Sequence, residues 1–197
     1  MARLVTFGCS MTYGVGLEDP QNQTWGACVS RALGRTHVNQ GQPGASNKFI
    51  SYKVTNFKYQ PDDLVMILWS FKDRYCILKS AGNSRFFYPA SEEQDSVLYY
   101  KEFYNDFDQE YINLVYVSYT IDFLLKNNIK FYQMFFRDSD VVPVLGKKNF
   151  IPVSLDKYFV NYPKGLDNAH LGKEGTEKYS EKLVEYLKRG LESKSII

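Results

Sequence analysis

The sequence predicts a single α/β domain in which helices cover both faces of a central parallel sheet. Short, continuously apolar segments alternate with longer segments whose apolar residues recur at helical spacing. Strands separated by helices favour parallel pairing, and right-handed crossovers then place helices on both faces. A chain of 197 residues suits one such domain better than two. We therefore expect residues 1–197 to form one three-layer αβα sandwich whose parallel sheet has about five strands.

Five segments have the composition of strands. Leu4–Phe7 is apolar and ends at Gly8, as expected of a buried parallel strand. Leu64–Trp69 is apolar without interruption, so we expect it in the middle of the sheet. The candidate strands are residues 4–7, 37–39, 64–69, 129–136 and 150–153, of which the last is the weakest.

Helix signals occupy most of the intervening segments. Thr24 and Ser46 are suitable N-caps for the first two helices. The third expected helix is long, and we expect a break within 105–108. The last is amphipathic and ends at Gly190, whereas residues 75–94 have the composition of an irregular excursion. The expected helices are residues 25–33, 46–57, 95–127 and 173–189.

Composition and charge argue against two classes of partner. Lys and Arg total 24 against 22 acidic residues, and the formal net charge of +2 is not gathered into a basic run or a basic helix face. We therefore expect no nucleic-acid partner. No stretch approaches the roughly 18 apolar residues of a membrane-spanning helix, so no membrane partner is expected.

Cysteine content and the N-terminal segment bear on location. Cys9, Cys28 and Cys76 are an odd number in a chain too large to need disulfides, so we expect free thiols in a reducing compartment. The segment Met1–Phe7 runs directly into a strand and lacks the apolar stretch of a signal peptide. These features predict a cytoplasmic protein, with export by a signal-independent route left open.

Two histidines are available as a catalytic base or a metal ligand. His37 lies at the start of an expected strand, where a structural role is favoured. His170 lies in a polar loop before the last helix, close after Asp167, and such loops gather beyond the carboxyl ends of parallel strands. An Asp at that offset can accept the imidazole Nδ1–H and leave Nε2 free to take a proton. With one suitably placed histidine and no cysteine cluster, no zinc site is expected.

Ser10 carries the hydroxyl that such a base would need. It follows the first strand directly, where Gly8 permits a tight turn that exposes a side chain at the sheet edge. A serine hydroxyl is a poor nucleophile unless a neighbouring base removes its proton. The alternative is that Ser10 only caps the helical turn that follows.

Three segments together resemble the sequence blocks of one enzyme superfamily. Leu4–Gly16, Val38–Ser46 and Asp167–Gly175 resemble, in that order, the first, second and last blocks of the SGNH (GDSL-like) hydrolases. The resemblance implies a flavodoxin-like αβα fold and a serine esterase. It implies that Ser10 is the nucleophile, that His170 is its base and that Asp167 orients the base. It also implies that the N–H groups of Ser10 and Gly44 hold the oxyanion.

The chain departs from the superfamily pattern at two places. Cys9 replaces the usual acid before the serine, either as a small buried filler or as an alternative nucleophile. The third block normally supplies an Asn side chain to the oxyanion hole, but the segment Trp69–Arg74 has none. Losing one oxyanion donor typically costs about 2.7–4 kcal/mol. We expect Ser70 to replace it, with Asn47, Lys72 or a backbone N–H as alternatives.

Substrate expectations come from charge and from the aromatic residues. Arg74 and Arg137 each follow an expected strand and could bind an anionic substrate group, the alternative being surface ion pairs. The 16 Tyr, 14 Phe and 2 Trp either fill the core or line a cleft for a sugar or acyl group. The resemblance suggests a small O-acyl ester, such as an O-acetyl group on a carbohydrate. It implies no metal and no organic cofactor.

Two other functions stay as alternatives. The missing Asn motivates a degenerate member of the superfamily that binds a glycan or acyl ligand without turnover. The loop Gly8–Gly16 motivates nucleotide or flavin binding, but it lacks the phosphate-loop pattern and the third glycine of the dinucleotide motif. Within the enzyme hypothesis, the acyl group, the alcohol, the acceptor (water or another hydroxyl) and the oligomeric state are open.

Overall fold

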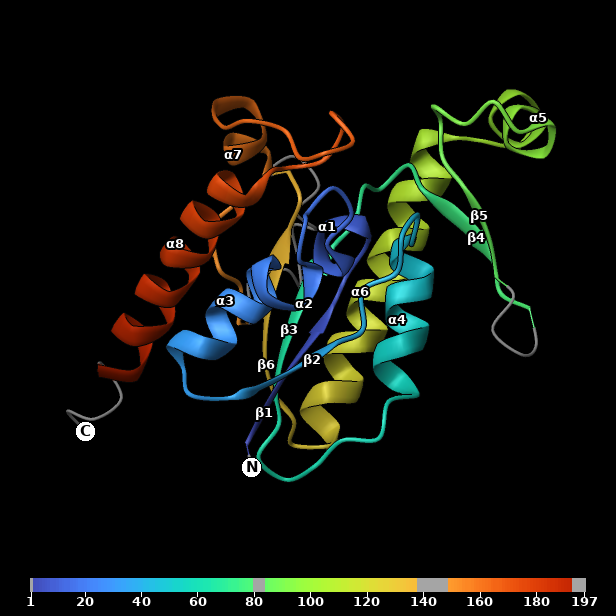
Figure 1. Ribbon diagram of the computed structural model, residues 1–197. Coiled ribbons are helices and arrows are strands. Elements are labelled where there is room, and N and C mark those ends of the chain that lie inside the picture. Colours follow the sequence, from blue (N-terminus) through green and yellow to red (C-terminus); the bar gives the residue numbers. More distant parts are fainter. Residues whose placement is uncertain (1, 80–83, 138–148, 193–197) are drawn as a thin grey trace.

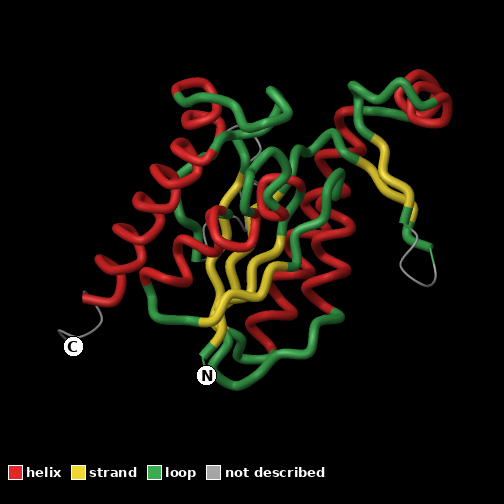
Figure 2. The backbone as a smooth tube through the Cα atoms, viewed as in Figure 1, coloured by secondary structure: helices red, strands yellow, loops and turns green. Residues whose placement is uncertain are grey.

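The computed structural model describes residues 2–79, 84–137 and 149–192. Its centre is a four-stranded parallel sheet with the strand order β2-β1-β3-β6 (Figure 2). Strand β3 pairs with both β1 and β6, and its residues from Val65 onward are buried. A strand covered on both faces needs apolar side chains on both, which explains its continuous apolar sequence. The strands are β1 (Arg3–Phe7), β2 (Thr36–Asn39), β3 (Leu64–Trp69) and β6 (Lys130–Phe135).

Helices cover both faces of this sheet (Figure 1). α3 (Trp25–Ala32) packs with α8 (Lys173–Glu192) on one face, and α4 (Asn47–Thr55) packs with α6 (Asp106–Lys126) on the other. Successive side chains of β3 alternate between the two cores. Met66 and Leu68 belong to the core under α3 and α8, while Val65, Ile67 and Trp69 belong to the core under α4 and α6. The predicted three-layer αβα architecture is confirmed.

The predicted helix starts are also confirmed. Thr24 Oγ1 accepts a hydrogen bond from Ala27 N at 3.3 Å and begins α3, and Ser46 Oγ accepts one from Phe49 N at 3.4 Å and begins α4. The expected break in the third helix falls at Asn105, whose side chain caps α6 after α5 (Gln94–Glu102) has ended.

The fifth strand, expected at residues 150–153, is not formed. Phe150 makes one isolated parallel bridge to Gln133 of β6. Beyond it, Pro152 has no N–H to donate, and Val153 N bonds back to Ile151 O at 2.8 Å, which curls the chain away from the sheet edge. The sheet of the described chain therefore has four strands and a single bridge.

The prediction that residues 75–94 are irregular is wrong for part of that segment. β4 (Tyr75–Ile77) and β5 (Arg85–Phe87) pair as an antiparallel hairpin, which projects from the body together with α5 (Figure 1). Tyr99 of α5 stacks on Tyr75 with ring centroids 4.7 Å apart and contacts the ring of Phe87 at 5.5 Å. These contacts join a helix to both strands of the hairpin, and the period of apolar residues within one segment does not encode them.

Several smaller features complete the described chain. Three short helices lie in segments expected to be loops, and α8 continues past Gly190, where an end was predicted. Cys9, Cys28 and Cys76 are free thiols, as expected. Among the described residues, no helix combines the length and apolar composition needed to cross a membrane. The short helices are α1 (Ser10–Tyr13), α2 (Pro20–Gln23) and α7 (Asp156–Asn161).

Candidate active site

Ser10 lies where β1 ends at the carboxyl edge of the sheet. A Cβ on Gly8 would overlap Thr12 Oγ1 and would lie 3.0 Å from Leu68 O, so the chain can turn this closely only at a glycine. Cys9, which is buried in the core, is the N-cap of α1, and Ser10 is the first helical residue rather than the cap. Within the described chain, Ser10 N donates to no protein acceptor, as an oxyanion donor requires.

The loop after β2 is held against this turn. Asn39 Nδ2 donates to Thr12 O at 2.8 Å, and Gln42 N donates to Gly8 O at 3.0 Å. Gly44 has a φ of 76°, in the left-handed region that favours glycine. Its N–H makes no hydrogen bond to any described residue. The N–H groups of Ser10 and Gly44, the two backbone donors predicted for the oxyanion hole, are therefore unpaired among the described residues. They lie on two segments that hydrogen bonds hold together.

Two glycines that the sequence analysis did not single out bring the last loop to the Ser10 segment. Leu166 N donates to Gly16 O at 2.8 Å. A Cβ on Gly165 would overlap Gly16 O, and a Cβ on Gly16 would lie 2.8 Å from Asp167 Oδ1. The backbones can approach this closely only because neither residue has a side chain. This contact joins positions about 150 residues apart in sequence, and a local pattern gives no signal for it.

Asp167 and His170 form the predicted pair. His170 Nδ1 lies 2.5 Å from Asp167 Oδ2, and Asp167 Oδ1 accepts hydrogen bonds from the backbone N–H groups of Ala169 and His170 at 3.0 and 2.9 Å. These bonds lower the pKa of Asp167 to about 2, and the bond from His170 N has the largest effect. Between them, Asn168 has a φ of 54°, which asparagine tolerates better than most residues. The carboxylate therefore fixes both the loop and the imidazole.

Ser10 and His170 line one cavity of about 420 Å³ at the carboxyl edge of the sheet. Phe71, Phe136 and Phe159 supply much of its apolar wall. Ser10 is 5% exposed, and no hydrogen bond joins its hydroxyl to His170 in the described structure. The fold thus brings Ser10 and His170 to one cavity, without a direct hydrogen bond between them in the described structure.

Asn47 and Ser70, two predicted oxyanion donors, lie in a buried network. Asn47 Oδ1 accepts from Ser70 N at 2.7 Å, and Asn47 Nδ2 donates to Ser70 O at 3.2 Å and to Asn113 Oδ1 at 2.7 Å. Ser70 Oγ accepts from Arg74 Nη1 at 3.2 Å. Lys72, a further alternative, is paired with Glu110. Because both Nδ2 contacts of Asn47 are internal, its role in this structure is to hold the turn after β3.

Replacing Asn47 should destabilise the protein. Asn47→Ala leaves the backbone N–H and C=O of Ser70 and the Oδ1 of Asn113 without their partner in a buried region. We expect a loss of about 2–4 kcal/mol in the free energy of unfolding, measured by urea titration. Asn56→Ala, at the exposed end of the same helix, is the matched control and should lose less than about 1 kcal/mol. Equal effects of the two variants would contradict the role given to Asn47.

Both predicted substrate-binding arginines line the cavity. Arg74 and Arg137 lie over the ring of Phe71, with their Cζ atoms 4.7 and 4.8 Å from its centroid. Neither forms an ion pair with a carboxylate of the described chain, so the alternative of surface ion pairs is not observed.

Two other features lie outside this site. His37 Nε2 bonds Thr6 Oγ1 at 2.9 Å, and burial lowers its pKa to about 4, which fits the structural role expected of it.

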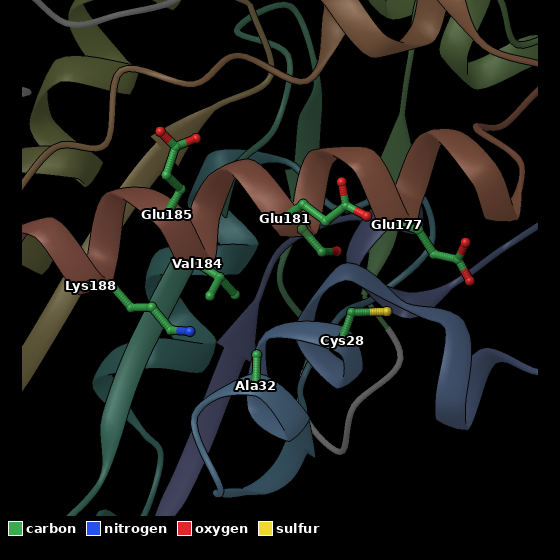
Figure 3. A pocket seen from close by; sticks show the side chains of 8 residues that line it. Cys28, Ala32, Glu177, Glu181, Val184, Glu185 and Lys188 are labelled. Carbon is green, nitrogen blue, oxygen red and sulfur yellow. The ribbon is translucent and has the colours of Figure 1, made fainter.

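A second hollow, of about 440 Å³, lies between α3 and α8 and includes Cys28 and Glu181 in its walls (Figure 3). Neither Ser10 nor His170 lines it.

Solved structures share this fold, whereas no protein-family model and no curated protein sequence matches the chain. A member of the lipolytic G-D-S-L family from Veillonella parvula superposes with a TM-score of 0.55 at 11% identity, covering 96% of this chain and 100% of that one. A lipase from a goat rumen metagenome superposes with a TM-score of 0.55 at 13% identity, covering 93% of this chain and 96% of that one. An acetyl xylan esterase from the rumen bacterium Butyrivibrio proteoclasticus gives 0.62 at 14% identity, covering 96% of this chain but 64% of that one.

The protein therefore has the SGNH/GDSL-like hydrolase fold, as the sequence resemblance predicted. Its structural neighbours include lipolytic proteins and an acetyl esterase, so the fold is one that supports ester hydrolysis. At identities of 11 to 14% the likeness defines the fold and not the reaction, which must be argued from the site.

Proposed function

We propose that the protein is a serine-dependent ester hydrolase in which Ser10 is the nucleophile, His170 the general base and Asp167 the group that orients the base. The observation that carries this proposal is that Ser10 and the Asp167-bound His170 line one cavity. That cavity lies at the sheet edge where αβα proteins gather their functional groups.

The proposed reaction is acyl transfer to water. Ser10 Oγ attacks the ester carbonyl while His170 Nε2 takes its proton, and Asp167 stabilises the imidazolium that forms. The imidazolium then protonates the leaving alcohol, and water releases the acyl group by the reverse sequence. Catalytic hydrogen bonds are often long without substrate, so the open geometry between Ser10 and His170 is compatible with this step. The route itself consumes no metal or organic cofactor.

Three donors are proposed for the oxyanion. The unpaired N–H groups of Ser10 and Gly44 supply two of them. Ser70 is our third, because Arg74 occupies one lone pair of its oxygen and leaves the O–H free to donate. Asn47 acts in this proposal by positioning Ser70 rather than by contacting substrate.

The proposed substrate is a small O-acyl ester. A cavity of about 420 Å³ accommodates a short acyl chain and part of an alcohol, and its aromatic wall suits a sugar ring or an apolar group. One structural neighbour is an acetyl xylan esterase, which supports carbohydrate O-acetyl groups as the first substrates to assay.

The decisive test is labelling with a fluorophosphonate probe, followed by intact mass and mapping of the modified residue. We expect a single label on Ser10 that disappears in His170→Ala. Ser118→Ala, whose hydroxyl bonds Leu114 O on α6, is the control and should label like the wild type. A label at another residue, or one that persists without His170, would refute the proposal.

A non-catalytic glycan- or acyl-binding protein is the second candidate. The absence of a Ser10–His170 hydrogen bond in the described structure, together with the missing Asn, favours it. It predicts no label on Ser10 and saturable binding of an acetylated oligosaccharide in calorimetry.

A further inference from the structure

One wall of the cavity carries two positive charges on a single aromatic ring. Arg74 follows β3 and Arg137 follows β6, and these strands are paired neighbours whose carboxyl ends lie at the same sheet edge. Both guanidinium groups lie over Phe71, and all three residues line the cavity with Ser10 and His170. Cation–π packing of this kind orients a guanidinium without neutralising it.

These charges have no carboxylate partner within the described chain. Arg74 donates a hydrogen bond to Ser70 Oγ, and Arg137 makes a cation–π contact with the ring of Phe71. Asp156 also lines the cavity, and its Oδ1 accepts from Lys157 N at 2.9 Å. Asp167 is bound to His170. The cavity wall thus holds two cations against one acid, and the two like charges on one ring repel each other.

We propose that Arg74 and Arg137 form an anion subsite, so that the ester cleaved at Ser10 carries a carboxylate near the scissile bond. This proposal rests on the proposed function and names its substrate class. A guanidinium presents paired N–H donors that match a carboxylate, and an anion placed beside both arginines removes their mutual repulsion. The carboxylate belongs either to the acyl group, as in a dicarboxylate hemiester, or to the alcohol, as in an acetylated acid.

Matched charged and neutral esters test the proposal. Mono(4-nitrophenyl) succinate has a carboxylate on its acyl group, which its methyl ester lacks. 4-Acetoxybenzoate has a carboxylate on its alcohol part, which its methyl ester lacks. We expect kcat/KM to favour the charged member of one pair by roughly tenfold or more. In Arg137→Gln this preference should fall to about one, and Arg137→Lys should restore part of it. Arg74→Gln should act in the same direction, although it also breaks the bond to Ser70.

Arg189→Gln is the matched control, because it removes the same charge from an exposed position on α8. It should keep the wild-type preference. Equal preferences in the wild type, Arg137→Gln and Arg189→Gln would overturn the anion subsite while leaving Ser10-dependent hydrolysis intact.

A binding measurement separates failure of the subsite from failure of the proposed function. In Ser10→Ala protein, succinate should raise the melting temperature in a saturable way, and the added change Arg137→Gln should abolish that shift. If no ester is hydrolysed but this shift is present, the proposed reaction fails and the anion subsite stands. If succinate has the same effect with and without Arg137, the subsite is refuted.

Discussion

Ser10→Ala should reduce kcat/KM for 4-nitrophenyl acetate by about 10⁴-fold or more. Without the Ser10 hydroxyl, no acyl-enzyme can form, and a water molecule in its place is not held and activated as a nucleophile in the same way. The change removes one oxygen from a side chain that is 5% exposed, and Ser10 N–H stays in place, so the fold should be preserved. Initial rates and the thermal unfolding midpoint of the same preparation test both statements.

Two outcomes would contradict this prediction. If Ser118→Ala and Ser10→Ala hydrolyse the ester equally fast, no serine chemistry at Ser10 contributes to the rate. If Ser10→Ala keeps turnover that Cys9→Ala removes, the nucleophile is Cys9. The position of Cys9 argues against that result, because its side chain is 1% exposed and packs within the core.

Local sequence patterns were sufficient for the elements that form the layers. The apolar run of β3 needs both faces of a sheet to bury it, and the caps at Thr24, Ser46 and Asn105 satisfy the first N–H groups of their helices. These signals lie within a few residues of the structure that they specify. The β4–β5 hairpin is different, because Tyr99, on a separate element (α5), packs against it.

The candidate site shows the same division. Asp167 and His170 are three residues apart, so their pairing was readable from the sequence. The approach of Gly16 to Gly165 was not, and neither was the bond between Asn47 and Asn113, which are 66 residues apart. Arg74 and Arg137 could be suspected from their places after strands, but only the folded chain puts both on Phe71. Contacts between distant segments require the tertiary fold, which a local pattern does not encode.

Asp167→Asn should lower kcat for the same ester by roughly 10²- to 10³-fold. The amide oxygen can still accept from Ala169 N and His170 N, so the loop should keep its shape. The amide NH₂ then faces His170 Nδ1 and favours the tautomer that carries the proton on Nε2, where the base must be unprotonated. The same change in a buried triad costs about 10⁴-fold, and we expect less here because the Asp167 side chain is 32% exposed to water.

The pH dependence provides the sharper readout. The pKa of Asp167 is lowered to about 2, so the stabilisation gained from its ionised form is present above the unfolded value near 4 and is lost as pH falls toward 2. Asp167 therefore stays ionised through the range of an esterase assay. Protonation of Asp167 should therefore lower the free energy of unfolding between about pH 4 and 2, below the range of that assay.

Removing the carboxylate should remove that contribution to stability. In Asp167→Asn, the free energy of unfolding should fall less between about pH 4 and 2 than it does in the wild type, because the amide takes up no proton there. Asp122→Asn removes an equal charge on the exposed side of α6 and should keep the wild-type pH dependence. Urea titrations at several pH values measure the difference. A wild-type pH dependence in Asp167→Asn would mean that the ionised carboxylate does not stabilise the loop that carries His170, because its bonds to Ala169 N and His170 N are the contacts that lower its pKa.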